Sequence, residues 1–225
     1  MNGMEQRTRT TIAVSKQAVR RGVLHFAMSD RFRSYPWREE GRSPYEILIA
    51  EVVLKRTTAT AASRLYAVFL RKFKDIKALH RATEKEIAAA LAPIGLQNQR
   101  ARSLKHLAAY LIEQEFQQVP RSLKELLRVP GIGDYTARAI RSFAYGIPAA
   151  IVDSNVERII CRVFQKCFRT SPSGTLLQAI ADMLLPQKAH RVFNLGMLDI
   201  GALVCRPARP NCRECPLRRA CDYAG

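Results

Sequence analysis

The sequence predicts an all-α fold made of two helical lobes with a central cleft. Apolar residues recur at the three- and four-residue spacing of amphipathic helices along most of the 225 residues. Thr83 with Glu86, and Ser122 with Glu125, have the spacing of helix N-terminal caps. No segment alternates apolar and polar residues with the period of a β-strand. A chain of this length can bury a sizeable core, and we expect a ligand to bind in the cleft.

The helices are expected in chain order with short loops between them. The first should begin at Lys16, because the polar and basic residues 1–14 are expected to fray. Pro44 suits the first turn of the second helix, and Gly95 follows the end of a later one. The predicted helical segments cover residues 16–27, 44–54, 62–70, 84–92, 100–116, a short stretch after Ser122, 136–145, 155–168, 175–185 and 189–205.

The composition is strongly basic. There are 37 Lys and Arg against 19 Asp and Glu, which gives a formal net charge of +18 and predicts a polyanionic partner. With 48% hydrophobic residues, the chain should fold rather than stay a disordered basic tail. No stretch approaches the roughly 18 uninterrupted apolar residues of a membrane-spanning helix. The N-terminus also lacks a secretory signal, so we expect an intracellular protein with no membrane contact.

Four of the six cysteines lie close together near the C-terminus. Cys205, Cys212, Cys215 and Cys221 have the spacing C-x6-C-x2-C-x5-C. Four thiolates in a compact loop can bind one tetrahedral zinc ion or one iron–sulfur cluster, and the spacing alone leaves both possible. Cys161 and Cys167 lie on the apolar stripe of a predicted helix and are interpreted as core residues.

The segment LLRVPGIGDYTARAI predicts a tight hairpin between two helices. Gly131, Ile132 and Gly133 form its tip, where glycines allow backbone N–H groups to approach a phosphate at the N-terminus of the next helix. Such a hairpin would hold DNA without reading its sequence. An ordinary turn between helices is the alternative interpretation.

Two carboxyl groups are candidates for catalysis. Asp153 follows an apolar run and precedes a helix, so it can cap that helix and also remain an anion that stabilises an oxocarbenium-like transition state. Glu51 lies inside an apolar helix, where burial would favour a protonated carboxyl group suited to proton transfer. A structural cap and a partnered core glutamate are the respective alternatives.

Four motifs follow one another over about residues 20 to 222: PWREEGRSPYEILIAEVVLKRTT, LRVPGIGDYTARAI, IVDSNVERI and FNLGMLDIGALVCRPARPNCRECPLRRAC. In this order they resemble the endonuclease III superfamily (helix-hairpin-helix, Gly-Pro-Asp) of DNA glycosylases. The resemblance implies a catalytic Asp153 and a four-iron four-sulfur (4Fe-4S) cluster held by the four C-terminal cysteines. It also implies one glycosylase unit over 1–225, with a six-helix lobe at about 31–145 and a cluster lobe at about 15–30 plus 146–225.

Position 135 separates the branches of this superfamily. Bifunctional members have a Lys there that forms a Schiff base with the sugar, whereas this chain has Tyr135, and a phenol cannot form an imine. The adenine-removing MutY branch usually has Ser there and an extra C-terminal domain, for which the four residues after Cys221 leave no room. The sequence looks most like the MIG-type thymine-DNA mismatch glycosylases. It therefore predicts a monofunctional glycosylase that removes T or U opposite G, with weak or no lyase activity.

The resemblance also assigns contacts with double-stranded DNA that contains a mismatched or damaged base. Arg56 occupies the wedge position, and Leu96 with Gln97 matches a second inserted loop. Asn155 would hold the sugar or a water, and Tyr135 would position the flipped base. The alternatives are an adenine glycosylase acting on A opposite G or 8-oxoguanine, and a non-catalytic iron–sulfur DNA-binding protein. We expect a monomer in the cytoplasm or nucleoid of a prokaryote.

Overall fold

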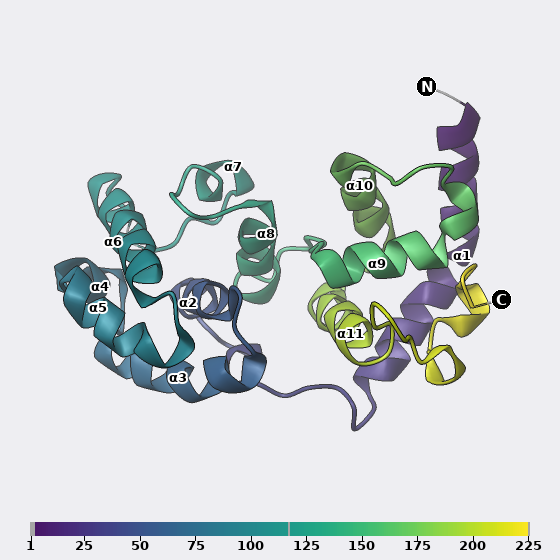
Figure 1. The fold of residues 1–225 in the computed structure, drawn as a ribbon. Helices are drawn as coiled ribbons and strands as arrows, with labels where there is room; N and C mark the ends of the chain where they lie inside the picture. The colour runs from purple at the N-terminus through teal and green to yellow at the C-terminus, as the bar shows by residue number, and fades with distance from the viewer. Residues whose placement is uncertain (1–2, 117, 225) are drawn as a thin grey trace. The chain divides into compact units, whose positions relative to one another are not determined.

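The computed structural model describes residues 3–116 and 118–224, which contain helices and no strand, so the predicted all-α class is confirmed (Figure 1). The chain forms two compact units. Unit 1 consists of Met1–Arg33 and Pro148–Gly225, and unit 2 of Ser34–Ile147. No helix in the described ranges is long and apolar enough to cross a membrane.

Unit 2 is a set of short helices around its own core. Its elements are η1 (Pro36–Arg38), α2 (Pro44–Leu54), α3 (Ala59–Lys72), α4 (Ile76–Arg81), α5 (Glu84–Leu91), η2 (Ala92–Ile94), α6 (Gln97–Glu113), α7 (Leu123–Leu126) and α8 (Asp134–Phe143). The helix starts follow from local sequence. Thr83 and Glu86 form the predicted capping box of α5, and Ser122 accepts the predicted bond from the Glu125 N–H at the start of α7. Both cap predictions are confirmed.

The core of unit 2 is aromatic and aliphatic. Tyr66 and Phe69 on α3 are among its largest fully buried side chains, and Trp37 packs edge-on against Tyr66. Helix α2 supplies an almost continuous buried run and packs against both α3 and α8. This packing fixes α2 beside the helix that follows the predicted hairpin.

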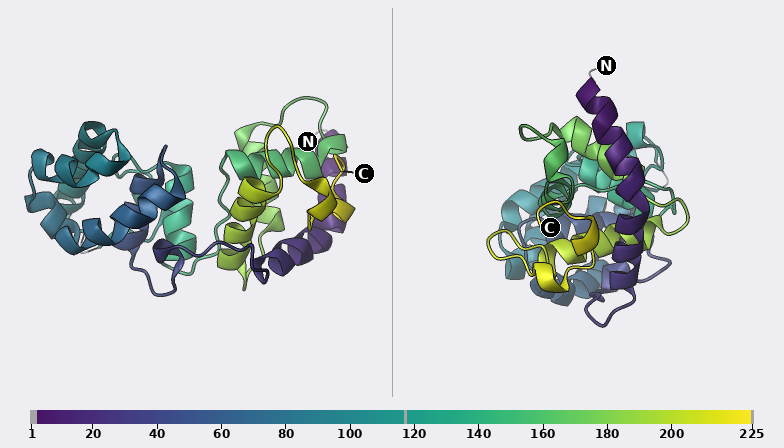
Figure 2. Two further views of the ribbon diagram at one scale, coloured as in Figure 1. Left: turned by 60° about the horizontal axis from the view of Figure 1, so that its bottom comes forward. Right: turned by 90° about the vertical axis from the view of Figure 1, so that its right-hand side faces the viewer.

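Unit 1 is built from both ends of the chain. Its elements are α1 (Gly3–Ala27), α9 (Ser154–Val163), η3 (Gln165–Cys167), α10 (Gly174–Leu184), α11 (His190–Leu203), η4 (Cys212–Glu214) and η5 (Arg218–Ala220). Helix α1 packs against α10, α11 and η5, and the yellow C-terminal loop lies beside it (Figure 2). Arg20 on α1 donates to the carbonyl oxygens of Leu184 and Leu185 at 2.7 and 2.6 Å, at the C-terminal end of α10.

The expectation that residues 1–14 fray is wrong for the described part of that segment. Helix α1 begins at Gly3, well before the predicted start at Lys16. Ile12 is fully buried in the core of unit 1 with Val19 and Val23. These three residues continue one helical stripe, so the buried face of the helix extends into the segment that was expected to fray.

Candidate functional site

The predicted hairpin between α7 and α8 is a tight turn. The Ile132 N–H donates to the Val129 carbonyl at 3.1 Å, and Gly131 has a φ of +83°, a conformation that favours glycine. The Ile132 side chain is buried and anchors the turn, whereas Gly131 and Gly133 are exposed. Gly133 is the N-cap of α8 and provides no side-chain acceptor, so the first N–H groups of α8 have no side-chain cap.

Helix α2 is tied to this hairpin. Lys55, at the C-terminal end of α2, donates from Nζ to the Gly131 carbonyl at 3.1 Å. Glu51 lies one turn earlier on α2 and is buried, and Tyr135 is the second residue of α8, half-buried. Because α2 packs against α8, unit 2 brings the helices of Glu51 and Tyr135 together with the hairpin.

The two predicted wedge loops have unusual backbones. Among the described residues, Arg56, Leu96 and Glu115 are the non-glycine residues with positive φ, so two of three lie at the predicted wedge positions. Arg56 (φ 54°) follows α2, and Leu96 (φ 52°) is the N-cap of α6, whose first residue is Gln97. Such conformations cost about 1–3 kcal/mol each and tend to occur at functional sites.

Asp153 caps α9 in unit 1. Its Oδ1 accepts from the backbone N–H groups of Asn155 and Val156 at 2.9 and 2.8 Å, and its Oδ2 accepts from the Asn155 side-chain amide at 2.7 Å. A carboxylate has about four acceptor positions, so the three donors fix its orientation and leave room for one more. Asp153 is half-buried, which leaves it accessible.

Arg158 connects this carboxylate to the cysteine loop. Its guanidinium donates to Asn155 Oδ1 at 2.8 Å, to the Gly201 carbonyl at 2.7 Å and to the Cys205 carbonyl at 2.7 Å. Gly201 is required here, since a Cβ on it would come within 2.5 Å of the Asn155 Cβ. The close approach of α9 and α11 therefore sets the position of Asn155, which in turn holds Asp153.

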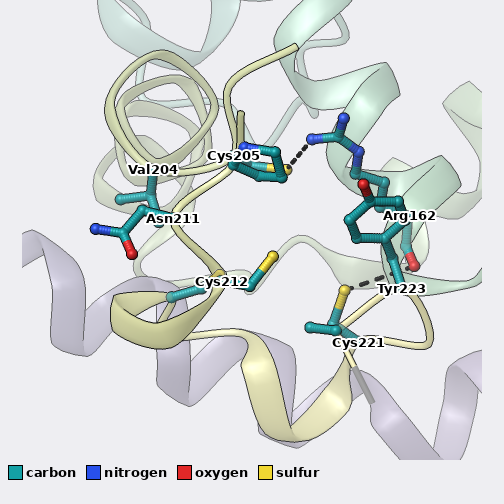
Figure 3. A pocket seen from close by; sticks show the side chains of 10 residues that line it. Arg162, Val204, Cys205, Asn211, Cys212, Cys221 and Tyr223 are labelled. Atoms are coloured by element: carbon teal, nitrogen blue, oxygen red, sulfur yellow. Dashed lines mark hydrogen bonds between the residues drawn. The ribbon is translucent and has the colours of Figure 1, made fainter. Parts of the chain in front are cut away.

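The four C-terminal cysteines line one cavity of about 250 Å³, counting the space open to solvent. In Figure 3, the side chains of Cys205, Cys212 and Cys221 point into this hollow, and Cys215 also lines it. Two backbone contacts anchor the loop: Asn211 N–H to the Val204 carbonyl at 2.9 Å and Asp222 N–H to the Val163 carbonyl at 3.1 Å. The loop thus closes on α9 and on the end of α11.

Arg162 is the cation at this cavity. It donates to Cys205 Sγ at 3.4 Å and to the carbonyl oxygens of Arg206 and Pro207 at 2.8 and 2.7 Å, and its guanidinium stacks over Tyr223 (Figure 3). Burial, with a smaller contribution from the neighbouring cysteines, raises the pKa of Cys215 to about 11. Four thiolates at such a site repel one another, so a bound cation or cluster is needed to stabilise them.

The donor set of four cysteine thiols that line one cavity is chemically suited to an iron–sulfur cluster. In residues 3–116 and 118–224, no three His, Cys, Asp or Glu side chains form a group suited to one metal ion. Zinc bonds of about 2.3 Å require sulfurs roughly 4 Å apart, whereas a cubane spreads its four cysteines over four separate irons. All four thiols nevertheless line one cavity.

Three functional contacts were not predicted from the sequence. Arg158 and Arg162 share a helix face with Asn155, at spacings of three and four residues. This spacing does not distinguish an arginine that binds distant carbonyl groups from one that is solvated. Gly22 lies inside the apolar pattern of α1, and a Cβ there would come within 2.5 Å of the Pro216 carbonyl oxygen in the cysteine loop. An isolated glycine in a helix indicates such a close approach.

A glycine hairpin that opens a helix, followed by an aspartate that caps the next, defines a helix-hairpin-helix protein within this all-α fold. Residues 49–175 match the family model described as "HhH-GPD superfamily base excision DNA repair protein". The chain belongs to this superfamily, and the predicted resemblance is confirmed.

Comparison with curated proteins shows which members of the superfamily the chain is similar to. The chain is 39% identical over 202 residues to a thymine/uracil-DNA glycosylase of Methanothermobacter thermautotrophicus, covering 89% of this chain and 90% of the relative. It is 33% identical over 214 residues to a thymine-DNA glycosylase of Aeropyrum pernix, covering 92% and 94%. An adenine DNA glycosylase of Mycolicibacterium smegmatis is 31% identical over 185 residues, but the chain spans only 63% of that protein.

Solved structures of DNA repair enzymes have the same fold as this chain. A thermostable thymine-DNA glycosylase aligns with a TM-score of 0.87 and 37% identity, covering 96% of this chain and 98% of the other. An endonuclease III in a trapped covalent complex with DNA aligns with a TM-score of 0.75 and 26% identity, covering 93% and 96%. Both similarities extend over nearly the whole chain.

Proposed function

We propose that this protein is a monofunctional DNA glycosylase that flips out a mismatched base, T or U opposite G, and hydrolyses its N-glycosidic bond. The observation that carries the proposal is Asp153, an accessible carboxylate fixed by three donors at the N-terminus of α9. The predicted enzyme class is confirmed, since the relatives across nearly the full chain are DNA glycosylases. Their names favour T and U over the adenine alternative.

Binding begins with the phosphate backbone. The net charge of +18 supports affinity for DNA that falls steeply with salt. Gly131, Ile132 and Gly133 would bring the uncapped N–H groups of α8 to a phosphate, because neither exposed glycine places a side chain in the way. The target nucleotide then leaves the stack, which costs least for a mispaired base. Arg56, Leu96 and Gln97 would fill the vacated space.

The superfamily resemblance assigns a role in bond cleavage to each candidate residue. Asp153 would stabilise the positive charge that develops on the sugar or orient the attacking water, using its remaining acceptor position. Asn155 would hold the sugar or that water, while Tyr135 would position the flipped base and Glu51 would supply or accept a proton. Because neither Tyr135 nor Asp153 can form an imine, we expect the abasic product to stay uncleaved.

A duplex panel tests the base preference. Purified protein is incubated with G·T, G·U and A·8-oxoguanine duplexes, followed by alkali to reveal abasic sites. We expect product from G·T and G·U and none from A·8-oxoguanine. Product from the adenine duplex alone would support the MutY-like alternative. Binding without product on any duplex would support the non-catalytic alternative.

We further propose that Cys205, Cys212, Cys215 and Cys221 hold a 4Fe-4S cluster. The four thiols share one cavity in the spacing that the superfamily resemblance implies. When bound, the cluster would supply a cross-link of the C-terminal loop rather than a step of the reaction. Arg206, Arg209, Arg213, Arg218 and Arg219 lie between the four cysteines in the sequence, so the ordered loop would present positive charge to DNA.

Purified protein should contain iron and sulfide, absorb broadly in the visible blue and hold no stoichiometric zinc. Cys212→Ser should abolish the iron, whereas Cys167→Ser, a matched thiol outside the cavity, should retain it. A cross-link closing about 15 residues contributes about 3 kcal/mol, so the Cys212 variant should melt roughly 6–12 °C lower. Zinc in place of iron on elemental analysis would overturn the assignment.

The place of action follows from the substrate. We propose that the protein works as a monomer on chromosomal DNA in the cytoplasm or nucleoid of a prokaryotic cell. The relatives from archaea and bacteria support the prokaryotic source.

A further inference from the structure

Arg100 is a buried cation in unit 2 whose bonds reach two separate loops. It lies on the first turn of α6 and is only 6% exposed. Its Nη1 donates to the carbonyl oxygens of Val52 and Val53 at 2.7 and 3.1 Å, and its Nη2 donates to the Lys55 carbonyl at 2.5 Å. The guanidinium therefore satisfies carbonyl groups that the end of α2 leaves without helical partners.

The same side chain also holds neighbours of both wedge residues. Lys55, whose carbonyl it binds, directly precedes Arg56, and Nη2 also donates to Thr57 Oγ1 on the other side, at 2.7 Å. Its Nε donates to the Gly95 carbonyl at 3.1 Å, directly before Leu96. A planar guanidinium fixes these five acceptors in one geometry, which the single ammonium group of a lysine cannot reproduce.

The wedge loops need such support, because Arg56 and Leu96 both adopt left-handed backbone conformations that persist only when surrounding contacts determine them. Both side chains are exposed, so their own packing does not fix them. Arg100 is the one side chain with recorded hydrogen bonds to residues flanking both positions in the described part of unit 2.

We propose that Arg100 is a positioning residue that locks the Arg56 and Leu96 loops into one rigid wedge for opening the DNA duplex. This role rests on the proposed glycosylase function. If Arg100 has this role, its loss should strongly slow the flipping of a paired base out of the stack. The loss should have a much smaller effect on excision of a base that is already unpaired. A purely structural role would affect both equally.

The test compares Arg100→Met with wild type on two duplexes, one with U opposite G and one with U opposite an abasic-site analogue. Excision in single turnover should fall roughly 100-fold on G·U, the size of effect that a 1 Å misplacement produces, and less than about tenfold on the unpaired U. The fluorescence of 2-aminopurine beside the uracil should show the same loss of flipping on G·U. Arg100→Lys should recover only part of the loss.

Lys105→Met provides the matched control, since Lys105 lies on the same helix and donates to the His80 carbonyl at the end of α4. It should change excision from both duplexes by the same small factor. If Arg100→Met is poorly folded by circular dichroism, Thr57→Val removes one acceptor and should give a smaller loss with the same G·U selectivity.

Two results would overturn the role: equal losses on the two duplexes, or losses from Arg56→Ala and Leu96→Ala that are unchanged in the Arg100→Met background. Inactivity of the wild-type protein on every duplex would be a different outcome, because it would overturn the proposed function itself.

Discussion

Asp153→Asn should lower the rate of base release from a G·U duplex by roughly 1,000-fold while leaving the fold and DNA binding nearly intact. A carboxylate about 4 Å from a developing sugar cation, at an effective dielectric constant of about 20, stabilises it by about 4 kcal/mol, and that loss corresponds to about three orders of magnitude in rate. Asparagine caps helices as well as aspartate does. The Asn155 and Val156 N–H groups therefore keep an acceptor.

The measurement is single-turnover excision with enzyme in excess, so that product release does not affect the measured rate. Asp75→Asn is the matched control, because Asp75 is the N-cap of α4 and accepts from the Ala78 N–H at 2.6 Å. That variant makes the same change of charge at the same type of cap and should keep the wild-type rate. An Asp153→Asn enzyme with wild-type activity would remove Asp153 from the chemistry.

Tyr135→Lys should convert the enzyme into one that also cleaves the strand. Tyr135 is the second residue of α8 and half-buried, so a lysine there lies at the positive end of a helix. The helix dipole and partial burial both favour the neutral amine, which is the nucleophile that attacks the sugar C1′ and forms an imine. A well-oriented amine has an effective concentration far above that of any amine in solution.

Both proteins are incubated with a labelled G·U duplex, with and without borohydride, and the products are resolved without alkali. Wild type should leave the strand intact and give no trapped adduct, whereas the Lys variant should nick the strand and be trapped covalently. Asp134→Lys places an amine one residue earlier on α8 and should do neither. If wild type nicks and traps as efficiently as the Lys variant, another residue supplies the amine and the monofunctional assignment is wrong.

The sequence predicted the parts of the site that are local in the chain. The caps at Asp153 and Ser122, the capping box at Thr83 and the Gly131 turn each depend on residues within a few positions of one another, and local rules cover them. The four-cysteine loop is also short in sequence. Spacing and residue type therefore carried these predictions.

The contacts that position the site could not be predicted from the sequence, because they join segments that are distant in the chain. Arg158 binds a carbonyl 47 residues away, and Arg100 binds Lys55 from 45 residues away. An arginine in a helix has the same sequence signature whether it is solvated or buried against carbonyl groups. The start of α1 was missed for the same reason, since the burial of Ile12 depends on helices that follow residue 148.

The division of the chain has a consequence for its synthesis. Unit 2 is one uninterrupted stretch, Ser34–Ile147, and can fold as soon as it leaves the ribosome, whereas unit 1 needs both Met1–Arg33 and Pro148–Gly225. Helix α1 is thus made before its partners, and its apolar stripe has no partner until α10 and α11 are synthesised. Arg20 and Arg21 add positive charge to α1, and such charge favours solubility of the helix during this interval.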